Sequence, residues 1–406
     1  MKRSAAILSV GNEVLRGSAV NTNAAFLGHE LTNLGFEVVS HGVCADSKEA
    51  IRFRLGEVIR RADVIIMTGG LGPTPDDVTR EGIAAHFKVP LIFSPTHYRR
   101  LEKIYKRYGK RIPRLVKQEA FYPKNAKPLV NRFGIALGFS IQAQKNLVIA
   151  LPGVPSELEN MYFDVVLPVL KKQFPELRSI PKLVARMTGI SEPDVMKKLG
   201  KDFFNAPFDF GIYPSAGEIA IRILAESSTI LSAVKKKIAA RLKDRIYAWN
   251  ETPLSSVIGN ILIKKKRTLA VAESCTGGLL ASRITACPGS SAYFRGATVA
   301  YHPAIKKLLG VPEDLIKKYG EVSPQVAVEL AKWVRVRMGS DYGIGVTGIA
   351  GPGGGSAKKP VGLVYIALAS SDARPQVWKF NFWGERHQVQ ARAVAKALEC
   401  LWRKIR

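Results

Sequence analysis

Short apolar runs alternate with segments of helical periodicity along the first 170 residues. Residues 22–34 repeat leucine at helical spacing, so that Leu27, Leu31 and Leu34 fall on one face. This alternation predicts a parallel sheet with helices on both faces, whose ligands bind beyond the carboxyl ends of the strands. Predicted strands lie at residues 5–10, 36–43 and 64–67.

Residues 171–250 have a different pattern, with shorter apolar segments. Two of these segments, at residues 209–212 and 218–224, have strand character, and residues 230–246 predict a basic amphipathic helix. We therefore expect a small α+β insert in this part of the chain.

Strand and helix patterns alternate again from residue 268, and the chain ends in a helix with an apolar stripe over residues 389–405. Predicted strands lie at residues 268–272, 297–301, 342–346, 361–369 and 376–382. The predicted fold class is α/β, with two Rossmann-like α/β domains at residues 1–170 and 251–406 joined by the small insert at residues 171–250.

The chain has 406 residues and a net charge of +28. Lys and Arg outnumber Asp and Glu by 23 to 15 in residues 1–170, by 15 to 8 in residues 171–250 and by 23 to 10 in residues 251–406. Charge spread in this way favours anionic substrates and a non-specific attraction to nucleic acid. The alternative is a compositional bias on a solvated surface.

The four cysteines, Cys44, Cys275, Cys287 and Cys400, have no paired spacing for zinc or for a redox couple. Reduced thiols in a cytoplasmic protein are the simplest interpretation. No stretch is long and apolar enough to cross a bilayer, so we expect no membrane partner.

The segment at residues 272–278, with sequence AESCTGG, follows a predicted strand and opens a helix. A nucleophile at Ser274 would gain from the amide donors and the dipole of that helix. Gly277 and Gly278 would let the backbone approach a substrate closely, and Thr276 is a further candidate for binding it. The alternative is an ordinary strand-to-helix turn with a capping Ser or Thr.

Tyr301 ends a predicted strand, and Lys306 lies one turn into the following helix. A serine hydroxyl is a weak nucleophile until a base removes its proton. A lysine is such a base only when burial or a neighbouring cation favours the uncharged amine. The alternative is that Lys306 and Lys307 form a solvated pair.

Two later segments add binding groups. The glycine-rich loop at residues 345–355 contains Thr347, Gly348 and Gly351 and can offer backbone N–H groups to a phosphate or an oxyanion. Arg386, at the start of the last helix, can clamp a phosphate or a carboxylate.

In the amino-terminal part, a glycine-rich loop follows the most apolar strand. Its phosphate-binding candidates are Gly69, Gly70, Gly72 and Thr74. Asp76 and Asp77 are candidates for holding a cation such as Mg²⁺ against a pyrophosphate. The alternative is that one of these aspartates only caps the next helix.

The AESCTGG segment, the Tyr-x₄-Lys spacing, the VTGIAGPxGG loop and Gly-Glu-Arg at residues 384–386 together resemble the CinA family. The carboxy-terminal domain of that family is a nicotinamide mononucleotide deamidase, which needs no metal. The resemblance implies Ser274 as the nucleophile, Lys306 as the base with Tyr301 assisting, Thr347 as an orienting group and Arg386 as a substrate clamp. Departures occur at residues 302–305, where the Asn and Glu of the family pattern are missing, and at Trp383 and Glu385.

Residues 1–170 resemble the molybdopterin-binding-like domain of the same family, which is a divalent-cation-dependent ADP-ribose pyrophosphatase in some members. Asp46 falls on the position of an expected family aspartate, which adds it to the metal candidates. Departures at Asn12, Ile135 and Leu137 lie near the crevice. The insert resembles a KH-like domain without a Gly-x-x-Gly clamp, which indicates a structural role.

The resemblance implies small-molecule nucleotides as substrates and a homo-oligomer, a dimer, as the assembly. Two other functions are open at this point. One is a competence-associated nucleic-acid-binding protein, and the other is a catalytically silent protein that binds a pterin or a nucleotide.

Overall fold

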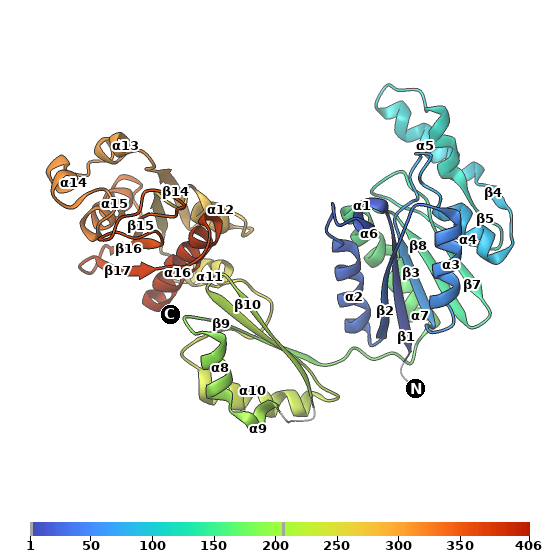
Figure 1. Ribbon diagram of the computed structural model, residues 1–406, viewed down its shortest axis with the longest axis horizontal. Coiled ribbons are helices and arrows are strands. Elements are labelled where there is room, and N and C mark those ends of the chain that lie inside the picture. Colours follow the sequence, from blue (N-terminus) through green and yellow to red (C-terminus); the bar gives the residue numbers. More distant parts are fainter. Residues whose placement is uncertain (1–2, 205–207) are drawn as a thin grey trace. The chain divides into compact units, whose positions relative to one another are not determined.

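The computed structural model describes residues 3–204 and 208–406. The chain divides into two compact units, one ending at Ile180 and the other beginning at Pro181. Figure 1 shows both units with their helices and strands labelled.

The first unit is built on a six-stranded sheet with the order β2-β1-β3-β8-β7-β6. The first four of these strands are parallel to one another, whereas β7 is antiparallel to both β8 and β6. The predicted parallel sheet is therefore confirmed, with an antiparallel edge. The bounds are β1 Ser4–Val10, β2 Glu37–Cys44, β3 Val64–Thr68, β6 Lys127–Leu129, β7 Gly138–Ala143 and β8 Asn146–Leu151.

Helices cover both faces of this sheet because its strands are apolar on both sides. Ala5 and Ile7 pack on one face with α2, α6 and α7, whereas Ala6 and Leu8 pack on the other face with α3 and α4. The bounds are α2 Thr22–Leu34, α3 Lys48–Val58, α4 Thr79–Phe87, α6 Pro155–Met161 and α7 Leu167–Gln173.

An excursion between α4 and β6 carries a two-stranded ribbon, a helix and a 3₁₀ helix. In Figure 1 it stands beyond one edge of the sheet, next to α4. Its elements are β4 Leu91–Phe93, α5 Pro95–Arg107, η1 Arg114–Ala120 and β5 Phe121–Pro123.

The second unit starts with the predicted α+β insert. Its antiparallel sheet has the order β10-β11-β9-β12, and α8 and α10 pack on that sheet. The helix predicted at residues 230–246 is present as α10, but it ends at Leu242, and the short strand β12 begins at Ile246. The bounds are β9 Lys182–Thr188, α8 Glu192–Leu199, β10 Asp209–Ser215, β11 Glu218–Leu224, α10 Ser228–Leu242 and β12 Ile246–Ala248.

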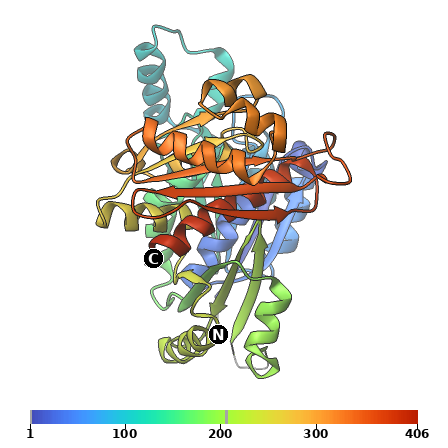
Figure 2. The same ribbon diagram turned by 90° about the vertical axis from the view of Figure 1, so that its left-hand side faces the viewer.

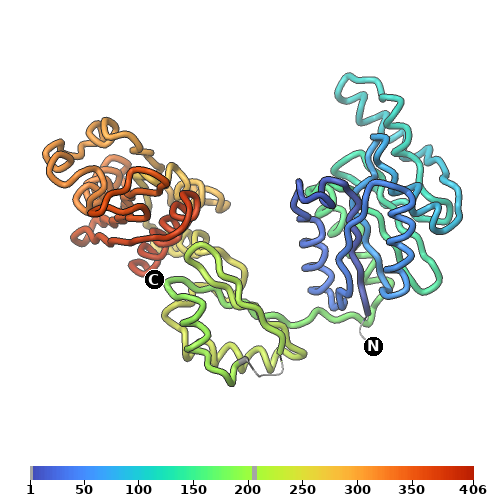
Figure 3. Tube along the Cα trace, in the orientation of Figure 1, coloured from blue at the N-terminus to red at the C-terminus, as the bar shows by residue number. Residues whose placement is uncertain are grey.

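The insert contacts the last helix of the chain. Tyr247 packs edge-on against Trp402, with 6.3 Å between ring centroids, and Arg406 donates to the carbonyl of Asp244 at 2.9 Å. Figure 3 shows the insert meeting the carboxy-terminal end of the chain.

The rest of the second unit is a five-stranded sheet with the order β14-β13-β15-β16-β17. β14, β13 and β15 are parallel, and β16 and β17 continue the sheet antiparallel. The α/β class predicted for this part is therefore confirmed. The bounds are β13 Leu269–Glu273, β14 Phe294–Val299, β15 Tyr342–Gly348, β16 Leu363–Ser370 and β17 Gln376–Asn381.

Alternation along β13 separates two apolar layers. Leu269 and Val271 face α11, α12 and α16, whereas Ala270 and Ala272 face α15. Figure 2 shows α15 in orange against one side of the sheet and α16 in red against the other. The helices are α11 Leu254–Lys264, α12 Leu279–Thr285, α13 Pro303–Leu308, α14 Glu313–Tyr319, α15 Pro324–Arg337 and α16 Arg386–Ile405.

Among the described residues, no helix combines the length and the apolar character that a membrane crossing requires.

Candidate active site

Ser274 follows the carboxyl end of β13, an interior strand of the sheet. Its backbone N–H donates to the carbonyl of Val346 on β15 at 3.0 Å, and its carbonyl accepts from Gly277 at 3.1 Å. The residue is 6% exposed. Gly278 then adopts a φ of 98° before α12 begins, a conformation that a residue with a Cβ rarely adopts. The predicted strand–turn–helix setting of Ser274 is therefore present.

The helix that follows does not offer its N-terminus to Ser274, which corrects that part of the sequence interpretation. The buried carboxylate of Glu273 accepts the N–H groups of Gly278, Leu280 and Ala281 at 3.0, 3.0 and 2.8 Å. Glu273 thereby satisfies donors that a helix leaves free at its first turn. We did not single out Glu273, although its position at the end of an apolar strand was visible.

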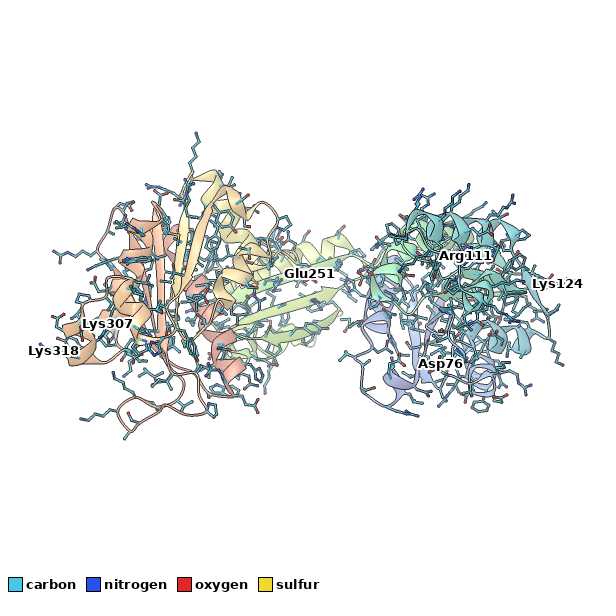
Figure 4. The ribbon with its side chains drawn as sticks, turned by 90° about the horizontal axis from the view of Figure 1, so that it is seen from above. Asp76, Arg111, Lys124, Glu251, Lys307 and Lys318 are labelled. Carbon is cyan, nitrogen blue, oxygen red and sulfur yellow. The ribbon has the colours of Figure 1, made fainter. Side chains whose placement is uncertain are left out.

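Lys306 is buried and faces the same region. It is 1% exposed, and its amine donates to the carbonyl of Tyr301 at 3.3 Å and to the carboxylate of Glu321 at 3.4 Å. Lys307, by contrast, pairs with Glu313 at 2.8 Å on the surface. Figure 4 labels Lys307 at the periphery of this unit, near Lys318. The alternative of two solvated lysines therefore holds for Lys307 only, because Lys306 is buried.

The departure from the family pattern between Tyr301 and Lys306 leaves the helix intact. His302 is the N-cap of α13, and its Nδ1 accepts the N–H of Ala304 at 3.2 Å. Pro303 occupies the first helical position, where no N–H is needed. His302 and Pro303 therefore start the helix that carries Lys306.

Arg386 and Tyr301 close one side of the site. Arg386 donates one N–H to the hydroxyl of Tyr301 and another to the carbonyl of Gly351 at 2.8 Å. β14 ends at Val299, so Tyr301 lies just after the strand instead of ending it as predicted. Glu385 is the N-cap of α16 and forms a capping box with Gln388, which explains how Glu serves here in place of Asp.

The glycine-rich loop is held by close backbone packing. A Cβ at Gly348 would lie 2.7 Å from the carbonyl oxygen of Leu363, and one at Gly351 would lie 2.7 Å from Val361. Thr347 is fully buried, and its hydroxyl donates to the carbonyl of Glu321 at 3.0 Å. Thr347 therefore fixes the segment that carries Glu321.

Residues from the Ser274 turn, the Lys306 helix, the glycine-rich loop and the start of α16 line one cavity of about 210 Å³. Thr276, Gly277, Gly278 and Thr347 were also candidates, but they are not among the described residues that line it. The hydroxyl of Thr276 is buried without a hydrogen-bond partner among the described residues. The cavity wall includes six predicted residues, Ser274, Tyr301, Lys306, Gly348, Gly351 and Arg386, and two that we did not predict, Cys275 and Glu321.

Cys275 is the other nucleophilic side chain on the cavity wall. It is 5% exposed, and burial raises the pKa of its thiol to about 12. A thiol is nucleophilic as the thiolate, so this burial disfavours Cys275 as a nucleophile. Its backbone carbonyl accepts a hydrogen bond from Gln390 of α16 at 2.8 Å, which anchors the turn that carries Ser274.

Within the described part of the chain, Ser274 Oγ and Lys306 Nζ share the cavity without a hydrogen bond between them. Catalytic hydrogen bonds are often longer before substrate binds. The arrangement brings together a hydroxyl, an amine and a guanidinium, which suits attack on a carbonyl in an anionic substrate.

The first unit has its own cavity, of about 370 Å³, at the carboxyl ends of β1, β3 and β8. It brings together most of the candidates predicted for this part of the chain, with the exception of Thr74. Asp76 is labelled in Figure 4. The candidates on the cavity wall are Gly69, Gly70, Gly72, Asp46, Asp76 and Asp77.

Two of the predicted phosphate-binding groups are already occupied. The N–H of Gly69 donates to the carbonyl of Leu151 at 3.2 Å. Thr74 donates its N–H and its hydroxyl to Asp77 at 2.8 and 2.6 Å. Asp77 therefore holds the loop itself, and the amides of Gly69 and Thr74 are not available to a phosphate.

The metal candidates do not form a ready-made ligand set. Asp46 accepts the N–H of Asn12 at 2.7 Å, and burial together with the charges of Glu13, Asp76 and Asp77 raises its pKa. Among the described residues, no three His, Cys, Asp or Glu side chains are placed to hold a metal ion. The carboxylates have suitable chemistry for a hard cation, but a cation would also need oxygen atoms from a ligand.

Glu119, in η1, was missed by the sequence analysis. Its carboxyl group lines the cavity, is fully buried and has no hydrogen-bond partner in the described part of the chain. Burial raises its pKa to about 7, with Asp77 and Glu157 adding to the rise and Arg80 opposing it.

The described wall of this cavity contains carboxylates and no Lys, Arg or His. An anionic ligand would therefore meet repulsion unless a cation accompanied it. The preference for anions expected from the net charge does not extend to this cavity. The carboxylates are those of Glu13, Asp46, Asp76, Asp77, Glu119 and Glu157.

Comparison with known families gives two matches. Residues 251–405 match the family model described as "CinA C-terminal domain", and residues 6–172 match the one described as "Probable molybdopterin binding domain".

Relatives with similar sequences agree with these matches. The chain is 37% identical to a competence-damage inducible protein of Halothermothrix orenii, over 99% of this chain and 98% of the relative. It is 38% identical to one from Clostridium botulinum, over 99% of this chain and 100% of the relative. Crystal structures of CinA from Thermoplasma acidophilum (33% identical, TM-score 0.38) and of a CinA superfamily protein from Escherichia coli (33%, TM-score 0.36) are also similar. They cover 42% and 37% of this chain, and 97% and 88% of their own chains. Sequence identity along almost its whole length shows that the chain belongs to the CinA family.

Proposed function

We propose that the carboxy-terminal part of the chain hydrolyses the carboxamide of nicotinamide mononucleotide to give nicotinate mononucleotide and ammonia. The observation that carries this proposal is the meeting of Ser274, Lys306, Tyr301 and Arg386 at one cavity. These residues come from three segments spread over more than 100 positions of the chain.

In this mechanism, Ser274 Oγ attacks the carboxamide carbon and its proton passes to Lys306 Nζ. The carbon–nitrogen bond then breaks, and the amide nitrogen leaves as ammonia with that proton. Water hydrolyses the resulting ester and releases the acid, with Lys306 again taking a proton. Arg386, which donates hydrogen bonds to Tyr301 and Gly351, would bind the anionic phosphate of the nucleotide.

The test is ammonia release by the full chain supplied with nicotinamide mononucleotide. Ser274→Ala and Lys306→Ala should each lower kcat by about 10³-fold or more, because each removes one half of the nucleophile–base pair. Lys307→Ala is the matched control, since Lys307 is the surface lysine next in sequence, and it should keep wild-type turnover. A Ser274→Ala protein with wild-type turnover would refute the mechanism.

The amino-terminal cavity supports a second candidate function, hydrolysis of the pyrophosphate of ADP-ribose. The supporting observation is that Asp46 and Asp76 line the same cavity as Gly70 and Gly72. A divalent cation held by these carboxylates would neutralise the pyrophosphate charge that the carboxylate-lined wall otherwise repels.

For this function, hydrolysis of ADP-ribose should require an added divalent cation and should fall by about 10-fold or more in Asp76→Ala. Asp76 is the better site for the test because Asp77 holds the loop through Thr74. Hydrolysis of equal rate in the presence of a chelator would remove the role proposed for the cation.

We propose nucleotide turnover in the cytoplasm, with the chain as a homodimer, as the setting of both activities. The four buried free thiols support a reducing compartment. If the protein binds nicotinamide mononucleotide or a pterin without turnover, it is a silent binder. If it binds duplex DNA with sequence preference at high salt, a nucleic-acid function replaces the enzymatic one.

A further inference from the structure

The carboxylate of Glu321 lies against the amine of Lys306, at the cavity that Ser274 lines. Glu321 Oε2 is 3.4 Å from Lys306 Nζ, and the second partner of the amine is the carbonyl oxygen of Tyr301 at 3.3 Å. The Lys306 side chain is only 2% exposed, whereas the Glu321 side chain is 41% exposed. The lysine amine is therefore oriented by two oxygen atoms at the edge of the cavity.

The backbone that carries Glu321 is fixed by the same sheet that places Ser274. Thr347 of β15 donates its hydroxyl to the carbonyl of Glu321 at 3.0 Å. β15 pairs directly with β13, and Ser274 follows the last residue of β13. On the other side, Ser323 Oγ donates to the carbonyl of Gly320 at 3.0 Å and caps α15. Glu321 is thus held between two anchored neighbours.

The other titratable or charged groups on the cavity wall do not substitute for Glu321. They are the thiol of Cys275, the phenol of Tyr301 and the guanidinium of Arg386. The first two are uncharged in their protonated forms, and Arg386 repels an ammonium group. Glu321 is the only carboxylate on the described wall of this cavity.

We propose that Glu321 is the positioning residue for Lys306, so that Ser274, Lys306 and Glu321 act as nucleophile, base and orienting carboxylate. The proposal rests on the deamidase activity proposed above. As Ser274 Oγ bonds to the carboxamide carbon, its proton passes to Lys306 Nζ, and the Glu321 carboxylate stabilises the ammonium group that forms. The ammonium group then gives the proton to the departing nitrogen, and the carboxylate stays ionised throughout.

The first test is the kinetics of Glu321→Gln in the full chain, with ammonia release from nicotinamide mononucleotide as the readout. This variant keeps the size of the side chain and removes its charge. We expect kcat to fall by about 10- to 100-fold with little change in KM, because Glu321 acts through Lys306. The pH–activity profile should also change, because the variant lacks the charge beside the amine that takes the proton.

Two further variants make this test specific. Glu321→Asp keeps the charge and should restore part of kcat and the wild-type pH profile. Glu313→Gln is the matched control, because Glu313 pairs with the neighbouring surface lysine Lys307, and it should leave kcat and the profile unchanged. An unchanged kcat and pH profile in Glu321→Gln would overturn the proposal, and so would a rise in KM alone.

A second readout does not depend on the substrate. The ¹³C NMR signal of the Lys306 ε-carbon, assigned by its loss in Lys306→Arg, reports the surroundings of the amine. At a fixed pH, its chemical shift should change in Glu321→Gln and should stay unchanged in Glu313→Gln. A wild-type protein that releases no ammonia would count against the deamidase, whereas an unchanged chemical shift in Glu321→Gln would count against the role of Glu321.

Discussion

At the scale of single residues, the two cavities differ in whether their buried ionisable group has a partner. Lys306 is buried with a carboxylate beside it, whereas Glu119 is buried without any hydrogen-bond partner among the described residues. A buried carboxyl group without partners favours its protonated form. Ionisation of Glu119 therefore destabilises the fold. A role in binding a ligand explains the position of this group better than a role in stability does.

Glu119→Gln should stabilise the protein at alkaline pH. The pKa of Glu119 is raised from about 4.5 when unfolded to about 7 when folded. The stability that this group contributes is thus fully present below pH 4.5 and is lost as pH rises through 7. Gln imitates the protonated form, so the variant should gain up to about 3 kcal/mol in free energy of unfolding at pH 8 and little at pH 4.5.

Urea denaturation at these two pH values checks this prediction. Glu157→Gln is the control, because Glu157 lines the same cavity but accepts a hydrogen bond from Asn131 at 2.6 Å. It should not be stabilised at pH 8. A loss of stability at pH 8 in Glu119→Gln would mean that the carboxylate has a favourable partner.

At the scale of secondary-structure elements, the start of α12 depends on one side chain. Glu273 accepts three backbone N–H groups there and is fully buried. Glu273→Gln replaces one acceptor oxygen by an NH₂ group that faces these donors. We expect the free energy of unfolding to fall by about 2–3 kcal/mol at pH 7, because buried donors lose a charged acceptor.

The same substitution should also lower the rate of ammonia release, since Glu273 precedes Ser274 and fixes its turn. Glu385→Gln is the matched control at the exposed start of α16, where loss of a cap costs about 1 kcal/mol. If the two variants lose the same free energy of unfolding, the burial of Glu273 does not increase its contribution to stability.

Local pattern was sufficient to predict several of these elements. The apolar run before Ser274 and the glycines after it both act through neighbours in sequence. The burial of Lys306 was not predictable in this way. It arises because Ile305 and Leu309 pack on the face of the sheet formed by Ala270 and Ala272, which lie more than 30 residues earlier.

Glu321 and Glu119 were missed for the same reason. Glu321 meets Lys306 only because a turn between two helices is fixed to β15 through Thr347. Glu119 reaches the amino-terminal cavity from the excursion between α4 and β6. Each contact depends on tertiary packing, about which the residues next to each carboxylate carry no signal.

At the scale of the whole molecule, each of the two compact units carries its own cavity, and the cavities differ in charge. The carboxy-terminal cavity has Lys306 and Arg386 against one carboxylate, whereas the amino-terminal cavity has carboxylates alone among the charged residues described on its wall. The net charge of +28 therefore says little about either ligand. A charge of this size is expected to attract polyanions non-specifically, whereas the residues of each site decide its chemistry.

The central claim is that Ser274 forms an ester with the acyl group of the substrate. It is tested most directly by mass spectrometry of the full chain, quenched in acid during turnover of nicotinamide mononucleotide. We predict a peptide containing Ser274 that carries the added mass of the substrate less ammonia, and no such adduct in Ser274→Ala. An adduct on Cys275, or turnover with ammonia release in Ser274→Ala, would contradict the account.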